Sequence, residues 1–329
     1  MKLNKHASYV LLYLLNGAAT AAAISERMPD VDIRSIQRSL VRLTELGLIV
    51  RNGTNNPTYS VHYQNLLKAA ISDKLLEDED RPMSAFHHNF IIWLENLSPK
   101  ELGLLFGEYA GSAANNKSDM PMSAKELEYL TVELSWKSSA LEGNTYTLLD
   151  TQLLLLEGIK AKKRTEFETQ MILNHKNAIA YIVEYKELFT GKLEFKTVEQ
   201  LHRIIGDNLG IGVGIRKKLV RITASNYTPL ANPHQLRENA DIILKIISRA
   251  PNPFAKALLA LALIPYLQIF EDGNKRTGRM LANALLIHSI GRGFSLRNTD
   301  ARNLALAYLS FYEFNSLRAL SKILQNELV

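Results

Sequence analysis

The residues with the clearest chemical character lie at 268–279, where the sequence is QIFEDGNKRTGR. Asp272, Gly273 and Asn274 predict a turn after a strongly apolar segment, and a helix is expected to begin at Asn274 or Lys275. The first amide groups of such a helix suit bound anions, and Gly273 lets the backbone approach closely. This stretch therefore predicts a site for phosphate oxygens.

Two arginines and an aspartate add charge to the predicted loop. Arg276 and Arg279 are three residues apart, so they share one helix face and can reach the same polyanion. Asp272 is placed to hold Mg²⁺ against those phosphates. The alternative is an ordinary helix N-terminus with surface arginines, but so many polar residues directly after an apolar helix favour anion binding.

Helices must supply most of the framework around this loop. From residue 124 onward, apolar residues recur mainly at helical spacing, and no internal repeat is apparent. The exception is 211–230, where the run from Leu219 to Ala224 alternates like a strand and predicts a small β-hairpin. We expect a mainly α fold with a helical core over 124–329, preceded by a helical linking region over 64–123.

The first 63 residues predict a separate winged helix-turn-helix domain. Helical patterns at 5–16, 20–28 and 33–46 precede a strand, a turn and a strand in LIV, RNGTNNP and TYSVHY. In a winged helix the third helix enters the major groove of DNA. The 33–46 helix is therefore the expected contact with nucleic acid.

That third helix carries a basic face. Arg34, Arg38 and Arg42 repeat every four residues opposite the apolar stripe. Gln37 lies beside them, and Arg51 follows in the wing. Guanidinium and amide groups on one face suit phosphates and base edges, so DNA is the predicted partner. A solvated charged face, or a surface that docks a protein, is the alternative.

Composition is consistent with a two-domain protein that contacts polyanions. The 329 residues are 47% hydrophobic and carry a net charge of +6. There is no cysteine, which excludes disulfides and thiolate metal sites and fits the reducing cytoplasm. The apolar segment near the N-terminus is too short to span a bilayer, and we expect neither an export signal nor membrane contact.

The loop resembles the core motif of the Fic family, His-x-Phe-x-(Asp/Glu)-Gly-Asn-x-Arg-x-x-Arg, at Phe270, Asp272, Gly273, Asn274, Arg276 and Arg279. Upstream, Ser138 and Glu142 stand in SSALEG, which resembles the family's inhibitory helix, (Ser/Thr)-x-x-x-Glu-(Gly/Asn). The resemblance implies that Glu142 pairs with Arg279 and so removes the arginine that would grip the γ-phosphate of a nucleotide.

The resemblance also implies an activity. A Fic core binds ATP with Mg²⁺ and transfers AMP to a Ser, Thr or Tyr hydroxyl of a target protein or of itself, and a homodimer is possible. The resemblance assigns the metal to Asp272. It assigns the phosphates to helix amides and to loop residues, namely Gly273, Asn274, Lys275, Arg276 and Arg279. The predicted strand at Leu219, Val220, Arg221, Ile222 and Thr223 takes the place of the family's flap, which would hold a target segment by strand addition.

Position 268 departs from the family motif, because Gln268 stands where the catalytic histidine is expected. An amide has no basic site near neutral pH, and a general base is typically worth ~10²–10⁴ in rate. Among the other histidines of the core, His175 and His202 stand in apolar-patterned helices. His234, just after the flap, is the better substitute.

Two hypotheses follow from these residues. In the first, the protein is a Glu142-restrained AMP transferase whose activity is weakened or altered by Gln268. In the second, it is a non-catalytic regulator in which the Fic core senses nucleotide and the winged helix binds DNA. Lys275 resembles a phosphate-transferring branch of the family, but that branch tends to lack the glycine and second arginine present here, so AMP transfer is preferred.

Overall fold

The computed structural model describes residues 3–69, 83–110 and 121–328, and most of the chain in these ranges is helical. The chain divides into two compact units. Unit 1 comprises residues 1–97, 221–229 and 305–319, and unit 2 comprises 98–220, 230–304 and 320–329. The domain boundaries expected near 63 and 123 remain predictions, and parts of the predicted linking region (70–82 and 111–120) lie outside the described residues.

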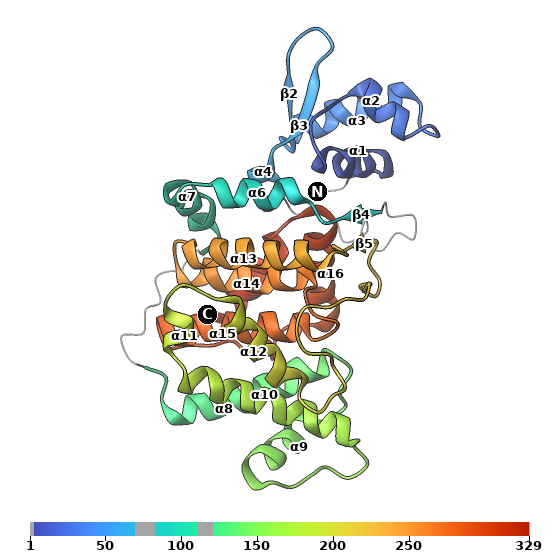
Figure 1. Ribbon diagram of the computed structural model, residues 1–329. Helices are drawn as coiled ribbons and strands as arrows, with labels where there is room; N and C mark the ends of the chain where they lie inside the picture. The colour runs from blue at the N-terminus through green and yellow to red at the C-terminus, as the bar shows by residue number, and fades with distance from the viewer. Residues whose placement is uncertain (1–2, 70–82, 111–120, 329) are drawn as a thin grey trace. The chain divides into compact units, whose positions relative to one another are not determined.

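Unit 1 begins with helices and a small antiparallel sheet (Figure 1). The elements are, in order, α1 (Lys5–Leu15), β1 (Ala19–Thr20), α2 (Ala21–Arg27), α3 (Ile33–Glu45), β2 (Ile49–Asn52) and β3 (Thr58–Val61). The sheet order is β1-β3-β2, and Arg51 lies opposite Tyr59 in the β2–β3 hairpin. The helices and the strand-turn-strand expected in the first 63 residues are thus present.

The amphipathic pattern of α3 explains how it packs. Ile36, Leu40 and Leu43 are fully buried, whereas the arginines on the opposite side of the helix are exposed. Further along unit 1 come α4 (Tyr63–Lys68), β4 (Ser84–Ala85) and α6 (His88–Asn96), and β4 pairs in parallel with β5 (Tyr227–Thr228).

Unit 2 is built around the helix pair α14 (Pro253–Leu267) and α15 (Asn274–Ile290), which lie side by side in Figure 1. Almost every residue of α14 is buried, as expected for a helix that is apolar on all sides. Gly278 allows the close approach, because a Cβ there would lie 3.1 Å from the carbonyl oxygen of Ala260. The segment between these helices is the predicted anion loop.

The remaining helices of unit 2 pack on this pair or on one another. They are α7 (Pro99–Ala110), α8 (Ala124–Ala140), α9 (Leu148–Gln152), the π-helix η2 (Leu153–Glu157), α10 (Glu166–Glu184), α11 (Glu187–Thr190), α12 (Phe195–Gly206) and α13 (Pro233–Arg249). The last helices described are α16 (Ala301–Phe314), most of which belongs to unit 1, and α17 (Arg318–Leu328), most of which belongs to unit 2. α8 and α10 pack against each other, and α8 carries the predicted inhibitory motif at its C-terminal end.

The strand predicted over Leu219–Ala224 is wrong. Leu219 is 79% exposed, and Ala224 has a left-handed φ of 60°, outside the β region. Within the described ranges these residues have no ladder partner, and the strand that does form nearby is β5. Alternation of side chains cannot make a strand unless a neighbouring strand receives its backbone hydrogen bonds.

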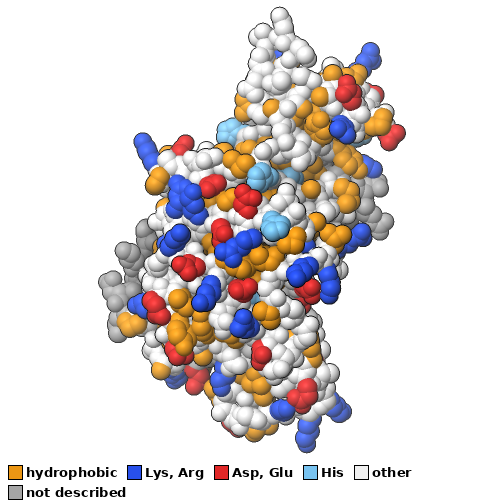
Figure 2. All heavy atoms as spheres, in the orientation of Figure 1, with side chains coloured by type: hydrophobic (Ala, Val, Ile, Leu, Met, Phe, Trp, Pro, Cys, Tyr) orange, Lys and Arg blue, Asp and Glu red, His pale blue; other side chains and the backbone are white. Residues whose placement is uncertain are grey.

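The exposed surface mixes charges of both signs. On the face shown in Figure 2, Lys and Arg side chains are interspersed with Asp and Glu and with hydrophobic side chains. None of the helices in the part of the chain that the structure describes combines the length and apolar character needed to cross a bilayer.

Candidate functional site

The loop at 268–273 is shaped by two residues in the left-handed conformation. Gln268 follows α14 with φ of 51°, and Gly273 precedes α15 with φ of 78°. Gly273 also faces the imidazole of His202, since a Cβ on it would lie 3.4 Å from that ring. α15 begins at Asn274, as predicted, and Gly273 meets the conformational demand of this turn.

Asn274 closes the loop on itself. Its Oδ1 accepts from the backbone N–H of Phe270 (3.0 Å), and its Nδ2 donates to the Phe270 carbonyl (2.9 Å). The same Nδ2 lies 3.2 Å from Oε1 of Gln268. Asn274 is buried, so its amide fixes the turn, and in this arrangement it is occupied within the loop instead of facing solvent.

Gln268 is the other half of this amide network. Its Nε2 donates to the carbonyl of Pro265 (2.7 Å), in the last turn of α14, and its Oε1 accepts from Asn274. The side chain is buried. Both ends of the amide are therefore engaged within the loop, and the position expected for a base is filled by a structural group.

Arg216 braces the loop from outside and was missed by the sequence analysis. This buried guanidinium donates to the backbone carbonyls of Gln268, Lys218 and Leu230. The backbone N–H of Arg216 donates to the carbonyl of Ile269 (3.0 Å). Arg216 thus ties residues 216–218 and 230 to the end of α14. In the sequence it is only the first of three consecutive basic residues that follow IGVGI.

Arg276 brings an incompletely paired charge to the loop. Its guanidinium is buried and donates from NH2 to Oδ2 of Asp272 (3.1 Å). Its Nε and NH1 have no hydrogen-bond partner among the described residues. Burial lowers the pKa of Arg276 from its ordinary value, with Asp272 and Glu142 acting in the opposite direction. Buried donors without acceptors are costly, so this arginine is suited to receive an anion.

Arg279 is held by the end of α8. Its Nε donates to Oγ of Ser138 (2.9 Å), and its NH2 donates to the Ser138 carbonyl (3.1 Å) and to Oε1 of Glu142 (2.7 Å). The structure therefore brings together the three residues that the resemblance linked, although about 137 residues separate Arg279 from Glu142 along the chain. We call this set of contacts the Arg279 clasp.

The carboxylate of Glu142 sits in a cationic environment. Burial by itself raises the pKa of Glu142, but Arg279, Lys275, the hydrogen bond from Arg279 and the charge of Arg276 outweigh it and hold the pKa below its ordinary value. Its side chain is 23% exposed. Glu142 is thus an anion held by the same cations that the sequence assigned to phosphate.

His175, on α10, supports the clasp. One ring nitrogen, Nδ1, lies 2.8 Å from the Met171 carbonyl, which can only accept, so Nδ1 carries the proton. The other, Nε2, then accepts from the hydroxyl of Ser138 (2.8 Å), which directs the Ser138 lone pairs toward Arg279. Burial lowers the pKa of His175 to about 3, which keeps the ring neutral.

The other histidines do not replace the missing base. His202 stacks on Phe270, with ring centroids 3.7 Å apart, and its Nε2 bonds the Asp272 carbonyl (2.9 Å). Burial lowers the pKa of His202 to about 4. His234 lies exposed in the first turn of α13, and the recorded partners of Gln268 do not include a histidine. Sequence reasoning was correct that His175 and His202 are packed.

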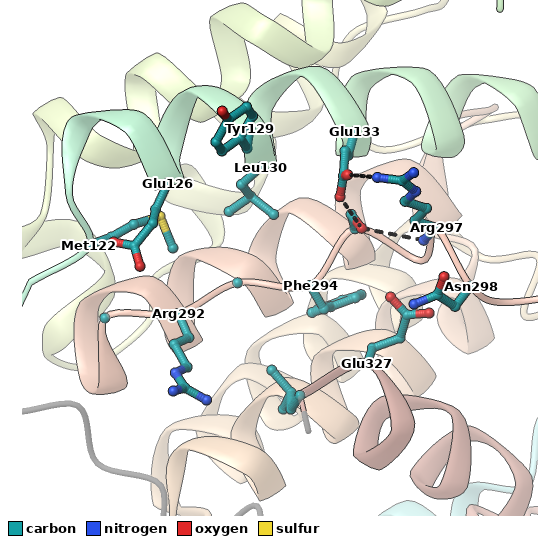
Figure 3. Close-up of a pocket in the computed structure, with 14 residues that line it drawn as sticks. Met122, Glu126, Tyr129, Leu130, Glu133, Arg292, Phe294, Arg297, Asn298 and Glu327 are labelled. Atoms are coloured by element: carbon teal, nitrogen blue, oxygen red, sulfur yellow. Dashed lines mark hydrogen bonds and ion pairs between the residues drawn. The ribbon is translucent and has the colours of Figure 1, made fainter. Parts of the chain in front are cut away.

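The middle of α8 contacts the segment that follows α15. Leu130 packs on Gly293, where a Cβ would lie 2.4 Å from Leu130 Cδ2. Glu133 pairs with Arg297 and accepts from the hydroxyl of Ser295 (3.1 Å). These residues line a cavity of about 580 Å³, and Figure 3 shows the pairing of Glu133 with Arg297 at this cavity. Glu133 is therefore a second anchored glutamate on the helix that ends in the clasp.

The predicted DNA-binding residues lie together in unit 1. Arg34, Gln37, Arg38 and Arg42 are exposed along α3, and Arg51 is exposed on β2. Arg38 bonds the hydroxyl of Ser35 (3.1 Å), and Arg42 lies 3.7 Å from Glu45. Gln37 and Arg51 line one cavity between α3 and the β2–β3 hairpin.

Comparisons with known proteins agree on one family. The Fic/DOC family model matches residues 192–286, which contain the loop. The Nematostella vectensis "Protein adenylyltransferase Fic" is 25% identical over 159 residues, covering 47% of this chain and 37% of that protein. The Caenorhabditis elegans "Protein adenylyltransferase fic-1" is 22% identical over 159 residues, covering 46% and 30%. The alignments thus span about a third of the length of these relatives.

A solved structure shares the fold. The Fic domain containing signaling protein from Bacteroides thetaiotaomicron superposes with a TM-score of 0.53 at 18% identity, covering 70% of this chain and 94% of that one. The resemblance drawn from the loop residues is therefore confirmed at the level of the domain and its mainly helical fold.

Proposed function

Because residues 192–286 match the Fic/DOC family model, we propose that unit 2 binds ATP and is a protein adenylyltransferase core that Glu142 restrains and Gln268 weakens. The observation that carries the proposal is the position of the Glu142 carboxylate, 2.7 Å from Arg279 and under the influence of Lys275 and Arg276. A phosphate group is also anionic and accepts charge-assisted hydrogen bonds, so it would be stabilised there in place of the carboxylate.

Hydrogen-bond donors for nucleotide phosphates are also present at the loop. Nε and NH1 of Arg276 have no partner among the described residues, and the first amides of α15 lie at the same end of the helix, directly after Gly273. A bound triphosphate would supply acceptors for these donors, and its terminal phosphate would compete with Glu142 for Arg279.

Asp272 fits the role of a magnesium ligand. Its side chain is 69% exposed, and the hydrogen bond recorded for its carboxylate, from Arg276, involves one oxygen, Oδ2. No cluster of three or more acidic or histidine side chains is found within the described ranges, so phosphates and water would have to complete the shell. This is the usual way Mg²⁺ is held, and the ion would neutralise phosphate charge.

In AMP transfer, a hydroxyl oxygen bonds to the α-phosphorus, the bond from that phosphorus to the β-phosphate bridge breaks, and pyrophosphate leaves. The hydroxyl proton must go to a base. Gln268 has no basic site, and its amide is occupied by Pro265 and Asn274. The residues here can therefore bind and orient the nucleotide, while proton removal falls to solvent or to the target, and transfer is slow.

Labelled ATP with Mg²⁺ tests this function. Wild type, Glu142→Gly, Gln268→His and the double variant are incubated with ATP labelled at the α-phosphate, and labelled protein is measured. Labelling by Glu142→Gly alone supports a weakened transferase. Labelling by the double variant alone indicates that the natural chain binds nucleotide without transfer, the second hypothesis. ATP binding by the same proteins is measured in parallel by calorimetric titration. If none of them binds ATP, the proposal is wrong.

A second candidate function, DNA binding, belongs to unit 1. The elements from α1 to β3 have the order of a winged helix, and α3 exposes three arginines while Arg51 is exposed in the hairpin. Duplex binding is measured across a salt series for wild type, Arg38→Ala and Arg42→Ala. Phosphate contacts predict that affinity falls with salt and that each variant has a shallower slope. Equal slopes in all three would favour a protein partner instead.

A further inference from the structure

A groove runs along one flank of α3 in unit 1. It encloses about 810 Å³ between α3, the start of α2 and the β2–β3 hairpin. Its lining mixes small and apolar side chains with polar and charged ones, among them Ile33, Gln37, Val41, Glu45, Arg51 and Tyr59. The arginines of α3 do not line it.

The exposed apolar side chains of α3 belong to this flank. Val41 is 57% exposed and Ile33 is 41% exposed, although the buried side of the helix has its own complete apolar stripe. Helical spacing places Ile33, Gln37 and Val41 in one row, each four residues from the next. Arg34, Arg38 and Arg42 form the adjoining row. The exposed surface of α3 therefore carries the Gln37 amide between two aliphatic side chains, next to a row of arginines.

The positive charge around the groove favours an anionic partner. Arg34, Arg38 and Arg42 flank it on the helix, and Arg51 lines it from the hairpin. The acidic residue at the groove, Glu45, stands at the C-terminal end of α3 and lies 3.7 Å from Arg42. Asp32 caps the N-terminus of α3, so both acidic residues stand at the ends of the helix and the arginine row lies between them. A polyanion is therefore favoured along that row, and duplex DNA has a major groove wide enough for a helix.

We propose that α3 recognises A·T base pairs in the major groove through Gln37 and Val41. The Gln37 amide can form paired hydrogen bonds with N6 and N7 of adenine, and Val41, one turn further on, packs against the C5 methyl of thymine in a neighbouring pair. Arg38 and Arg42 contact phosphates beside them. This inference rests on the proposed DNA binding by unit 1 and adds its sequence preference.

The test uses the full chain and synthetic duplexes. Wild-type protein selects sequences from a random 30-base-pair pool, and each thymine of the selected site is then replaced by deoxyuridine, which removes only the methyl group. We expect an A·T step in the selected site, and an affinity loss of about 5-fold or more at one thymine. Val41→Ser should bind the thymine and uracil duplexes equally, and Gln37→Ala should lose the adenine preference.

Val183→Ser is the matched control, because Val183 is a comparably exposed valine (40%) on a helix of unit 2. It should behave as wild type. The inference is wrong if the protein selects no preferred sequence, or if replacing thymine by uracil in the selected site does not change the affinity. In either case, salt-dependent binding to duplexes would still support the DNA function. Absence of any duplex binding at low salt overturns both.

Discussion

Replacing Glu142 by glutamine should change stability and nucleotide affinity in opposite directions. The substitution keeps the size of the side chain but removes the charge that faces Arg279 at 2.7 Å. Burial raises the pKa of Glu142, but its cationic neighbours outweigh this effect and hold the pKa below its ordinary value. The carboxylate is therefore charged throughout pH 6–8. The perturbation therefore acts fully at neutral pH.

The size of both effects follows from the geometry of the pair. At 2.7 Å and an effective dielectric constant near 20, the attraction is ~6 kcal/mol, most of which is offset by desolvation. Without Glu142, Arg279 retains Ser138, so the nucleotide-free protein should lose up to ~3 kcal/mol of unfolding free energy. The freed arginine should bind ATP more tightly by ~1–3 kcal/mol, or ~5–150-fold.

Calorimetric titration with ATP and Mg²⁺, together with urea unfolding, measures the two quantities. Glu133→Gln is the matched control, because Glu133 lies on the same helix and also pairs with an arginine, Arg297, away from the loop. It should leave ATP affinity unchanged. If Glu142→Gln binds ATP no more tightly than wild type and Glu133→Gln, the carboxylate does not compete with phosphate and the restraint proposed here is wrong.

Three further predictions concern the loop and its supports. Gln268→His should lower the unfolding free energy by about 1–3 kcal/mol in urea, since it removes two buried amide hydrogen bonds; an unchanged value would contradict the structural role of the amide. Arg216→Met leaves three backbone carbonyls without their donor and should cost at least about 3 kcal/mol, whereas the exposed Arg203→Met should cost little. The lowered pKa values of His175 (about 3) and His202 (about 4) mean that the unfolded chain takes up protons below pH 6.5 before the folded chain does. Stability should therefore fall as pH drops from 6.5 toward 4, by about 2 kcal/mol per ring at pH 5, and His202→Phe should remove its share of that slope.

The sequence predicted the loop because its parts are adjacent in the chain. The turn, the helix start at Asn274 and the arginine pair three residues apart are all local features, and local features follow from residue type and spacing. The pairing of Glu142 with Arg279 joins distant segments, and it was expected only because two motifs resembled one family in the family's order.

Arg216, and the contact by which His175 supports the Arg279 clasp, were missed for a common reason. Arg216 bonds backbone carbonyls, and His175 acts on Arg279 through the hydroxyl of Ser138. Backbone acceptors leave no trace in side-chain patterns, and a buried histidine in an apolar helix has the same pattern whether or not it orients a neighbour. The strand predicted from Leu219 onward failed for a related reason, since a strand depends on a partner that alternation does not reveal.

The position of Gln268 connects the structural and functional arguments. If the glutamine were an incidental loss of the base, its side chain would have no reason to be buried and bonded at both ends. Instead it joins the last turn of α14 to Asn274, the residue that closes the loop, and Arg216 holds its carbonyl from the other side. The amide therefore stabilises the shape of the loop while lacking the chemistry of a base. Under the proposed function, a loop of this shape restrained by Glu142 would make nucleotide binding conditional, and that property would serve a sensor as well as a slow transferase.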